Sequence, residues 1–236
     1  MNKLFAGFSR VNVTPMVEIG MPGYFKPRFA EGVLDELEIN ALALSCGEEE
    51  AVLLSIDHEG ITREIAADYR NHISEVTGVH REAIYLHATH IHTGPFLNKN
   101  SENELEQEYY RAVYRKMADA AQFALEDLKP AKMGWAVSQA PRITFSRRFR
   151  MKDGSVRTNP GVNNPDILEP IGEMDESVNV LRFDREGAES LVLVNYGNHA
   201  DAVGGCRISA DYPGFLRRTL EKTLSDAKCI FFNGAE

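Results

Sequence analysis

Two histidines close together in one segment are the residues of this chain best suited to chemistry. His90 and His92 stand at the end of a strand-like run in the segment Tyr85-Leu-His-Ala-Thr-His-Ile-His-Thr-Gly-Pro95. Because side chains alternate along a strand, we expect both imidazoles on one face, with His87 and Ile91 on the other. Two imidazoles on one face before a Thr-Gly-Pro turn are typical of half a zinc site. The alternative is a pair of strand-end histidines that hydrogen-bond to loops.

His199 is the residue that can complete such a site. It follows an apolar run in Leu193-Val-Asn-Tyr-Gly-Asn-His-Ala200, and ligand-binding residues collect at strand ends in α/β folds. Together with His90 or His92 it predicts a Zn²⁺ site, because zinc binds neutral imidazole and a catalytic zinc keeps one position open for water. Taken alone, His199 fits a core or capping histidine equally well.

Two carboxylates offer other ways to complete a metal site. Asp57 ends a strand in Asp57-His58-Glu59, where it could bind a metal or orient a ligating histidine. A cap or a surface charge is an equally good interpretation. Asp211 is expected to cap a helix, with a ligand role as the alternative. A site completed by Asp57 or Asp211 would indicate a different metal-dependent hydrolase. A chain with the fold but without turnover would be a non-catalytic binding module.

Arg147 is the candidate for a catalytic cation. It lies in a basic cluster of an otherwise acidic chain, formed by Arg142, Arg147, Arg148, Arg150, Lys152 and Arg157. An arginine there could stabilise a developing oxyanion or hold a polar head group. The alternative is a solvated hairpin, which is the usual place for a run of charges.

Composition restricts the class of protein. The chain has 236 residues, enough for one large domain or two small ones, and is 43% hydrophobic, enough for a substantial core. We expect a single domain over 1–236. Its net charge of −9 argues against nonspecific binding to nucleic acid or to an anionic membrane. No apolar run approaches the ~18 residues of a membrane span, and no signal peptide is recognisable. The three cysteines, Cys46, Cys206 and Cys229, are scattered, so we expect no disulfide framework and a cytoplasmic location.

The elements that must position these residues follow from hydrophobic spacing. Strands are expected at 4–13, 38–46, 51–56, 83–92, 132–140, 178–183, 190–196 and 228–232, and helices at 62–77, 104–128 and 211–224. The irregular order of strands and helices predicts an α/β (mixed α+β) fold, with helices packed outside mixed β-sheets. There is no Gly-x-Gly-x-x-Gly and no P-loop, so nucleotide binding has no support.

Helix ends are predicted from capping residues. Thr62 and Gly78 are expected to bound the first helix, and Ser101 with Glu104 forms a capping-box pattern before the second. Asp211 is expected to cap the third. The buried face of this third helix is expected to carry the apolar residues Phe215, Leu216, Leu220 and Leu224.

Four segments resemble the N-terminal catalytic domain of the neutral/alkaline, non-lysosomal ceramidases. They are Gly7-Phe-Ser-Arg-Val-Asn-Val-Thr-Pro15 with Met21-Pro-Gly-Tyr24, Thr89-His-Ile-His-Thr-Gly-Pro95, Ser146-Arg147, and Asn198-His199 with Ser209-Ala-Asp-Tyr-Pro-Gly-Phe215. The second resembles the family's Thr-His-Thr-His-Ser-Gly-Pro hallmark, from which Ile91 and Thr93 depart. Ser146 stands where the family has Asn. The order and spacing of the four segments, rather than any one of them, make the resemblance specific.

The resemblance implies a one-zinc amidase that splits the N-acyl bond of ceramide or a related small lipid amide with zinc-activated water. By it, His90 and His199 are zinc ligands, His92 is an acid/base or oxyanion group, and Arg147 steadies the substrate. The family's remaining ligands, a Glu and a Tyr, and its named nucleophile, a Ser, lie downstream of Glu236. We therefore expect the sequence to correspond to the N-terminal part of such a hydrolase, incomplete at its C-terminus, and the isolated chain to be inactive.

Overall fold

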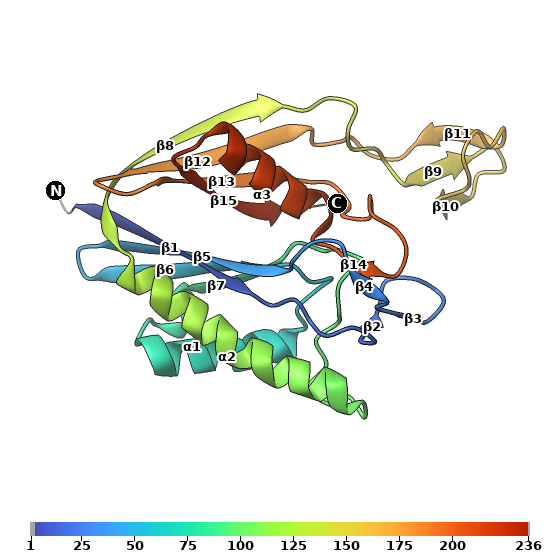
Figure 1. Ribbon diagram of the computed structural model, residues 1–236. Coiled ribbons are helices and arrows are strands. Elements are labelled where there is room, and N and C mark those ends of the chain that lie inside the picture. The colour runs from blue at the N-terminus through green and yellow to red at the C-terminus, as the bar shows by residue number, and fades with distance from the viewer. Residues whose placement is uncertain (1–2, 236) are drawn as a thin grey trace.

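One eight-stranded sheet, folded over so that its two halves face each other, forms the centre of the molecule (Figure 1). The computed structural model describes residues 3–235. The strand order is β15-β13-β12-β8-β1-β5-β6-β7. The first half consists of β1 (Leu4–Asn12), β5 (Glu38–Cys46), β6 (Glu49–Ile56) and β7 (Ile84–Ala88). The second half consists of β8 (Lys129–Gln139), β12 (Ser177–Arg185), β13 (Ser190–Tyr196) and β15 (Ala227–Asn233).

Helices cover both outer faces of the folded sheet, as predicted. α1 (Arg63–Thr77) and α2 (Glu104–Glu126) pack on the first half, and α3 (Asp211–Thr223) packs on the second (Figure 1). The sheet is mixed, because β6–β7 and β13–β15 pair in parallel and the other pairs are antiparallel. The predicted mixed fold with external helices is therefore confirmed. None of the helices within residues 3–235 is long and apolar enough to cross a membrane.

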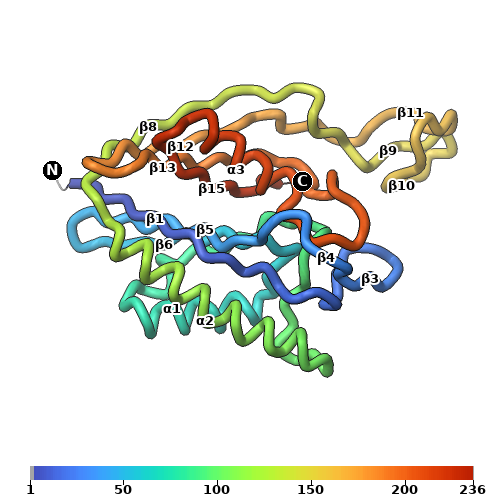
Figure 2. The backbone as a smooth tube through the Cα atoms, in the orientation of Figure 1, coloured from blue at the N-terminus to red at the C-terminus, as the bar shows by residue number. Residues whose placement is uncertain are grey.

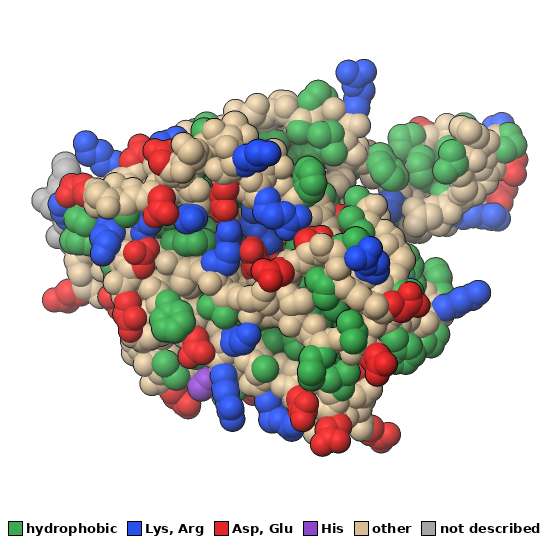
Figure 3. Space-filling view, in the orientation of Figure 1, with side chains coloured by type: hydrophobic (Ala, Val, Ile, Leu, Met, Phe, Trp, Pro, Cys, Tyr) green, Lys and Arg blue, Asp and Glu red, His purple; other side chains and the backbone are tan. Residues whose placement is uncertain are grey.

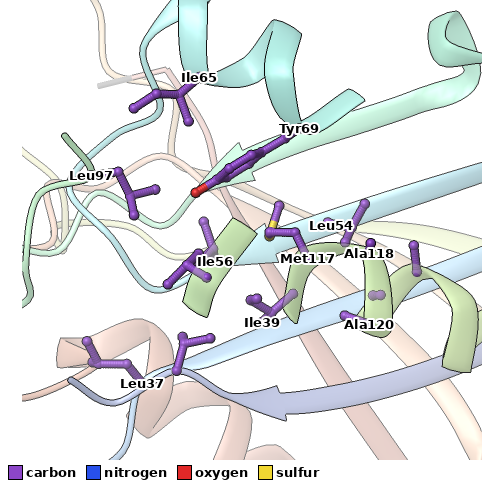
Figure 4. Packing of buried hydrophobic residues seen from close by; sticks show 14 of the residues in the cluster. Leu37, Ile39, Leu54, Ile56, Ile65, Tyr69, Leu97, Met117, Ala118 and Ala120 are labelled. Atoms are coloured by element: carbon purple, nitrogen blue, oxygen red, sulfur yellow. The ribbon is translucent and has the colours of Figure 1, made fainter. Parts of the chain in front are cut away.

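Strand β5 shows why the central strands are apolar on both faces. Ile39 and Ala41 face α2 in one core, whereas Leu42 faces the second half of the sheet in another. Figure 4 shows Ile39 in the first core with Met117 of α2 and Tyr69 of α1. A strand buried on both faces needs an apolar run, and residues 41–44 of β5 supply one.

Short elements extend from one end of the folded sheet. They are β2 (Gly20–Met21), β3 (Arg28–Phe29), β4 (Gly32–Val33), β9 (Arg148–Met151), β10 (Val156–Thr158), β11 (Ile167–Pro170) and β14 (Arg207–Ile208). The 3₁₀ helix η1 (Arg81–Ala83) lies at the opposite end, beside the turn between β5 and β6. Strands β9–β11 form a separate three-stranded sheet, which Figure 3 shows as a lobe set apart from the body. The predicted hairpin at Asp153-Gly154 joins β9 to β10, where Gly154 has φ +83°.

The ends of α1 are as predicted, whereas the start of α2 is not. Thr62 accepts a hydrogen bond from the backbone N–H of Ile65, and Gly78 ends the helix at φ +79°. The N-cap of α2 is Asn103 rather than Ser101. The Ser101 hydroxyl instead accepts from the Asn103 N–H at 3.1 Å, so it holds the residue that caps the helix.

Helix α3 differs most from expectation. It begins at Asp211 after Ala210, and the Asp211 side chain makes no cap. The apolar stripe does not face inward as a whole, since the side chain of Phe215 is 68% exposed. Arg217 is buried instead, with 1% exposure, and forms an ion pair with Asp57 at the end of β6. This pair sets the rotation of the helix against the sheet.

Candidate metal centre

The two histidines of the Thr-His-Ile-His segment lie in a loop rather than on a strand. Strand β7 ends at Ala88, and His90 has φ +64°, which no strand residue adopts. The backbone leaves the sheet because the N–H of His90 donates to the carbonyl of His58 at 2.9 Å. The predicted alternation of faces is therefore wrong. A positive φ at a non-glycine residue is a strained conformation of the kind found at functional sites.

The loop nevertheless brings His90 and His92 to His199. The ring centroids are 5.0 Å apart for His90–His92, 5.0 Å for His90–His199 and 4.7 Å for His92–His199. One ligand nitrogen from each residue lies within 4.8 Å of the other two. His90 and His92 follow β7 in the first half of the sheet, and His199 follows β13 in the second. The cluster therefore stands where the two halves meet.

Hydrogen bonding indicates which nitrogens of two rings could bind a metal. His90 Nδ1 lies 2.7 Å from the carbonyl oxygen of Glu59, so Nδ1 carries the proton and the lone pair is on Nε2. A metal-binding histidine usually donates its other ring N–H to a backbone carbonyl or a carboxylate in this way. His92 is only 7% exposed, and neither of its ring nitrogens has a hydrogen-bond partner within residues 3–235. A buried polar atom without a partner costs about 1–3 kcal/mol, so a bound group that pairs with the His92 ring is the simplest explanation for its burial.

The two carboxylates considered as ligands have other partners. Asp57 accepts both hydrogen bonds of the Arg217 guanidinium, at 2.9 and 2.6 Å. It also accepts from the hydroxyl of Thr89 at 3.2 Å and the N–H of Glu38 at 2.9 Å. Its oxygens are therefore fully engaged away from the histidine cluster.

Asp211 holds the loop that carries His199 rather than joining the cluster. Its carboxylate accepts from the backbone N–H of Ala202 at 3.4 Å and of Val203 at 2.7 Å. Within residues 3–235, the only group of three or more potential metal ligands is made of the three histidines.

A pocket of about 400 Å³ adjoins His199 and contains Arg147. Further polar side chains, among them Asp175 and Asp201, also line it, and Phe145 and Met174 supply apolar walls. The structure therefore brings Arg147 to the same pocket as His199, although the two are far apart in sequence. A pocket lined by both polar and apolar side chains suits an amphipathic ligand.

A loop that no sequence pattern had singled out as functional lies against His92. A Cβ atom added to Gly23 would stand 2.0 Å from His92 Nδ1, and Gly23 has φ +91°. The neighbouring ring of Tyr24 is 6.0 Å from the His92 ring, and the Tyr24 hydroxyl donates to the carboxylate of Asp201. This hydrogen bond raises the pKa of Tyr24. The signal in the sequence was the turn Met-Pro-Gly-Tyr, to which no role was assigned.

Replacing Gly23 by alanine is expected to displace the His92 ring and to destabilise the chain by about 1–3 kcal/mol. The new methyl group has no room, and the positive φ adds strain. Gly154→Ala is the matched control, because Gly154 has φ +83° and nothing stands within 4 Å of an added Cβ. Urea unfolding with ring NMR signals of His92 checks both effects. If the two variants behaved alike, strain alone would be responsible and the contact with His92 would have no weight.

Comparisons with known proteins identify a fold. No protein-family model and no curated protein matches the sequence. Solved structures match in three dimensions, and two of them share 18% sequence identity with this chain and cover 98% of it. One is the neutral ceramidase from Pseudomonas aeruginosa, with a TM-score of 0.76, and the other is a ceramidase complexed with C2, with a TM-score of 0.75. The chain spans 38% and 37% of their respective lengths. The residues that resembled the ceramidases thus belong to a chain that shares its fold with part of the neutral ceramidase from Pseudomonas aeruginosa.

Proposed function

We propose that this chain carries the metal centre of a zinc-dependent amidohydrolase that cleaves the N-acyl bond of a ceramide-like lipid amide with zinc-activated water. The observation that carries the proposal is the cluster of His90, His92 and His199, in which one ligand nitrogen of each ring lies within 4.8 Å of the other two. Imidazole nitrogens suit zinc better than magnesium or calcium, which prefer oxygen. The fold shared with ceramidases supports the choice of a lipid amide.

His90 and His199 are the proposed zinc ligands. The carbonyl of Glu59 keeps the proton of His90 on Nδ1 and so presents Nε2 as the donor atom. Bound zinc would act as a Lewis acid and lower the pKa of a coordinated water. The residues of the chain then have to orient the amide and move protons.

His92 and Arg147 have the proposed roles of proton transfer and charge stabilisation. A neutral imidazole at His92 can accept a proton and return it to the leaving amine. The guanidinium of Arg147, in the pocket beside His199, can donate hydrogen bonds to the oxygen on which negative charge develops. The apolar side chains of Phe145 and Met174 in the same pocket would contact the hydrocarbon part of the substrate.

Removing one proposed ligand is expected to weaken zinc binding strongly without unfolding the chain. His199→Ala should weaken zinc affinity by more than about 100-fold. Loss of a residue that only hydrogen-bonds to a metal ligand already costs about 10–100-fold. Competition with a chromophoric chelator measures the affinity, and elemental analysis gives the stoichiometry, expected to be one zinc per chain. His80→Ala is the matched control, because His80 is an exposed histidine at the opposite end of β7 from the cluster. Equal affinities of His199→Ala and the unaltered chain would refute the proposed centre.

A further inference from the structure

The ring of His92 is held differently from that of His90. The ring of His90 donates a hydrogen bond from Nδ1 to the carbonyl oxygen of Glu59 at 2.7 Å. His92 has none on either nitrogen within residues 3–235, so no side-chain hydrogen bond of its own fixes its orientation there. Its position must come from packing and from its backbone. The backbone contact leads to Arg28.

Arg28 joins three loops through one guanidinium. It donates to the carbonyl oxygen of His92 at 2.6 Å, of Pro22 at 2.9 Å and of Gly205 at 2.7 Å. Its guanidinium carbon stands 3.9 Å from the centre of the Tyr24 ring. Only a planar cation with several diverging N–H groups can make these contacts together. Arg28 therefore fixes the loop before β3 and the His92 loop at one point.

The same residues reach the loop of His199. Tyr24 donates to Asp201, two residues after His199, and Gly205 belongs to the same loop. The pairing of β4 with β14 keeps this loop beside the N-terminal segment. Figure 2 shows the two segments side by side, close to the labels β3 and β4. Arg28 and Tyr24 thus connect the loops that carry His92 and His199.

We propose that Arg28 is a positioning residue that sets the place of His92 relative to His199. It acts through the backbone carbonyl of His92, and the Tyr24 ring, stacked on its guanidinium, extends the connection to Asp201. Gly23 completes the arrangement, because only a residue without a side chain lets the loop lie against the His92 ring. The inference about the His92 ring stands on geometry alone. Its consequence for metal affinity rests on the proposed function.

The test compares histidine rings in the metal-free chain. ¹H–¹³C spectra of the ring Cε1–H groups are recorded at one fixed pH, with His92 identified by His92→Gln. Arg28→Ala is expected to shift or broaden the His92 signal while that of His72, on α1, stays in place. Lys26→Ala is the matched control, because it removes a positive charge from the same loop at an exposed side chain. It is expected to move neither signal.

Two further measurements separate positioning from general stability. Arg28→Lys keeps the charge but cannot reach three carbonyls, so it is expected to move the His92 signal in the same direction. If Arg28→Ala does not fold, Arg28→Lys is the variant that tests the role of Arg28. Because the His92 ring lies 5.0 and 4.7 Å from the rings of the two proposed ligands, its displacement disturbs their surroundings, and cobalt titration is expected to show an affinity about 10–100-fold lower for the Arg28 variants. An unmoved His92 signal in a folded variant, or equal shifts of His92 and His72, would overturn the role of Arg28. Failure of the unaltered chain to bind cobalt would count against the metal centre only, because the ring signals still decide the role of Arg28.

Discussion

Replacing Arg217 by methionine is expected to lower the free energy of unfolding by about 3–5 kcal/mol. The Arg217 side chain is 1% exposed and lies 2.6 Å from an oxygen of Asp57, whose side chain is also 1% exposed. It lies 3.1 Å from Glu38 as well. Removal of the guanidinium leaves the Asp57 carboxylate buried without its counter-ion, which costs far more than the contact itself is worth.

The adjacent residue provides a sharp control for this effect. Arg218 also forms an ion pair, with Asp35 at 3.2 Å, but its side chain is 45% exposed. Arg218→Met is therefore expected to change stability by no more than about 1 kcal/mol. Urea unfolding of both variants gives the comparison. In addition, the double variant Arg217→Met with Asp57→Asn should recover part of the loss, because residue 57 then carries no buried charge.

A similar loss in the Arg217 and Arg218 variants would contradict this account of α3. So would a double variant no more stable than Arg217→Met alone. The first result would mean that the buried pair is no stronger than a surface pair. The second would mean that the loss comes from packing of the arginine stem, not from the charge left on Asp57.

Local signals predicted much of the fold correctly. Strands β5 and β6 were recognisable because two apolar segments are separated by the charged turn Gly47-Glu-Glu-Glu50. Helix α1 was recognisable because Thr62 and Gly78 act on their own neighbours in sequence. The same holds for the hairpin at Gly154. In each case, the residues that determine the element lie within it or beside it.

Features that depend on distant residues were not predictable. Arg217 is buried because it forms an ion pair with Asp57, 160 positions earlier, and no pattern within α3 reveals that partner. The histidine cluster shows the same limit. His-x-His and His199 were correctly chosen as a set that could lie together, but the left-handed conformation of His90 was not anticipated. Arg28 was overlooked, because three backbone carbonyls leave no trace in the sequence.

Acidification is expected to destabilise the chain between pH 6.5 and about pH 4, because two histidines are buried in the neutral state. Burial lowers the pKa of His58 from 6.5 to about 3 and that of His87 from 6.5 to about 4. Between the folded and unfolded values the unfolded chain binds more protons, so the free energy of unfolding falls as the pH falls. From pH 7 to pH 5 each histidine is expected to contribute a loss of about 2 kcal/mol.

Hydrogen bonds explain why neither ring takes a proton easily. His58 Nε2 lies 2.7 Å from the Tyr109 hydroxyl, which donates its own proton to the Val13 carbonyl, so Nε2 is the protonated nitrogen. The buried Nδ1 of His58 has no hydrogen-bond partner within residues 3–235, so a second proton there would be unsatisfied. His87 Nε2 accepts from the backbone N–H of Asn233 at 2.9 Å and therefore cannot carry a proton without breaking that bond.

Substitution of one buried histidine separates this effect from the titration of carboxylates. Most carboxylates titrate below about pH 5, so the range from pH 7 to pH 5 reports mainly on histidine. His87→Gln should flatten the dependence of the unfolding free energy on pH in that range by about 2 kcal/mol. His80→Gln, at an exposed position, should leave the slope as it is. An unaltered chain whose stability is constant from pH 7 to pH 5 would show that these two rings are protonated in the folded state, and that the contact of His87 with Asn233, which joins the edges of the two halves of the sheet, opens in solution.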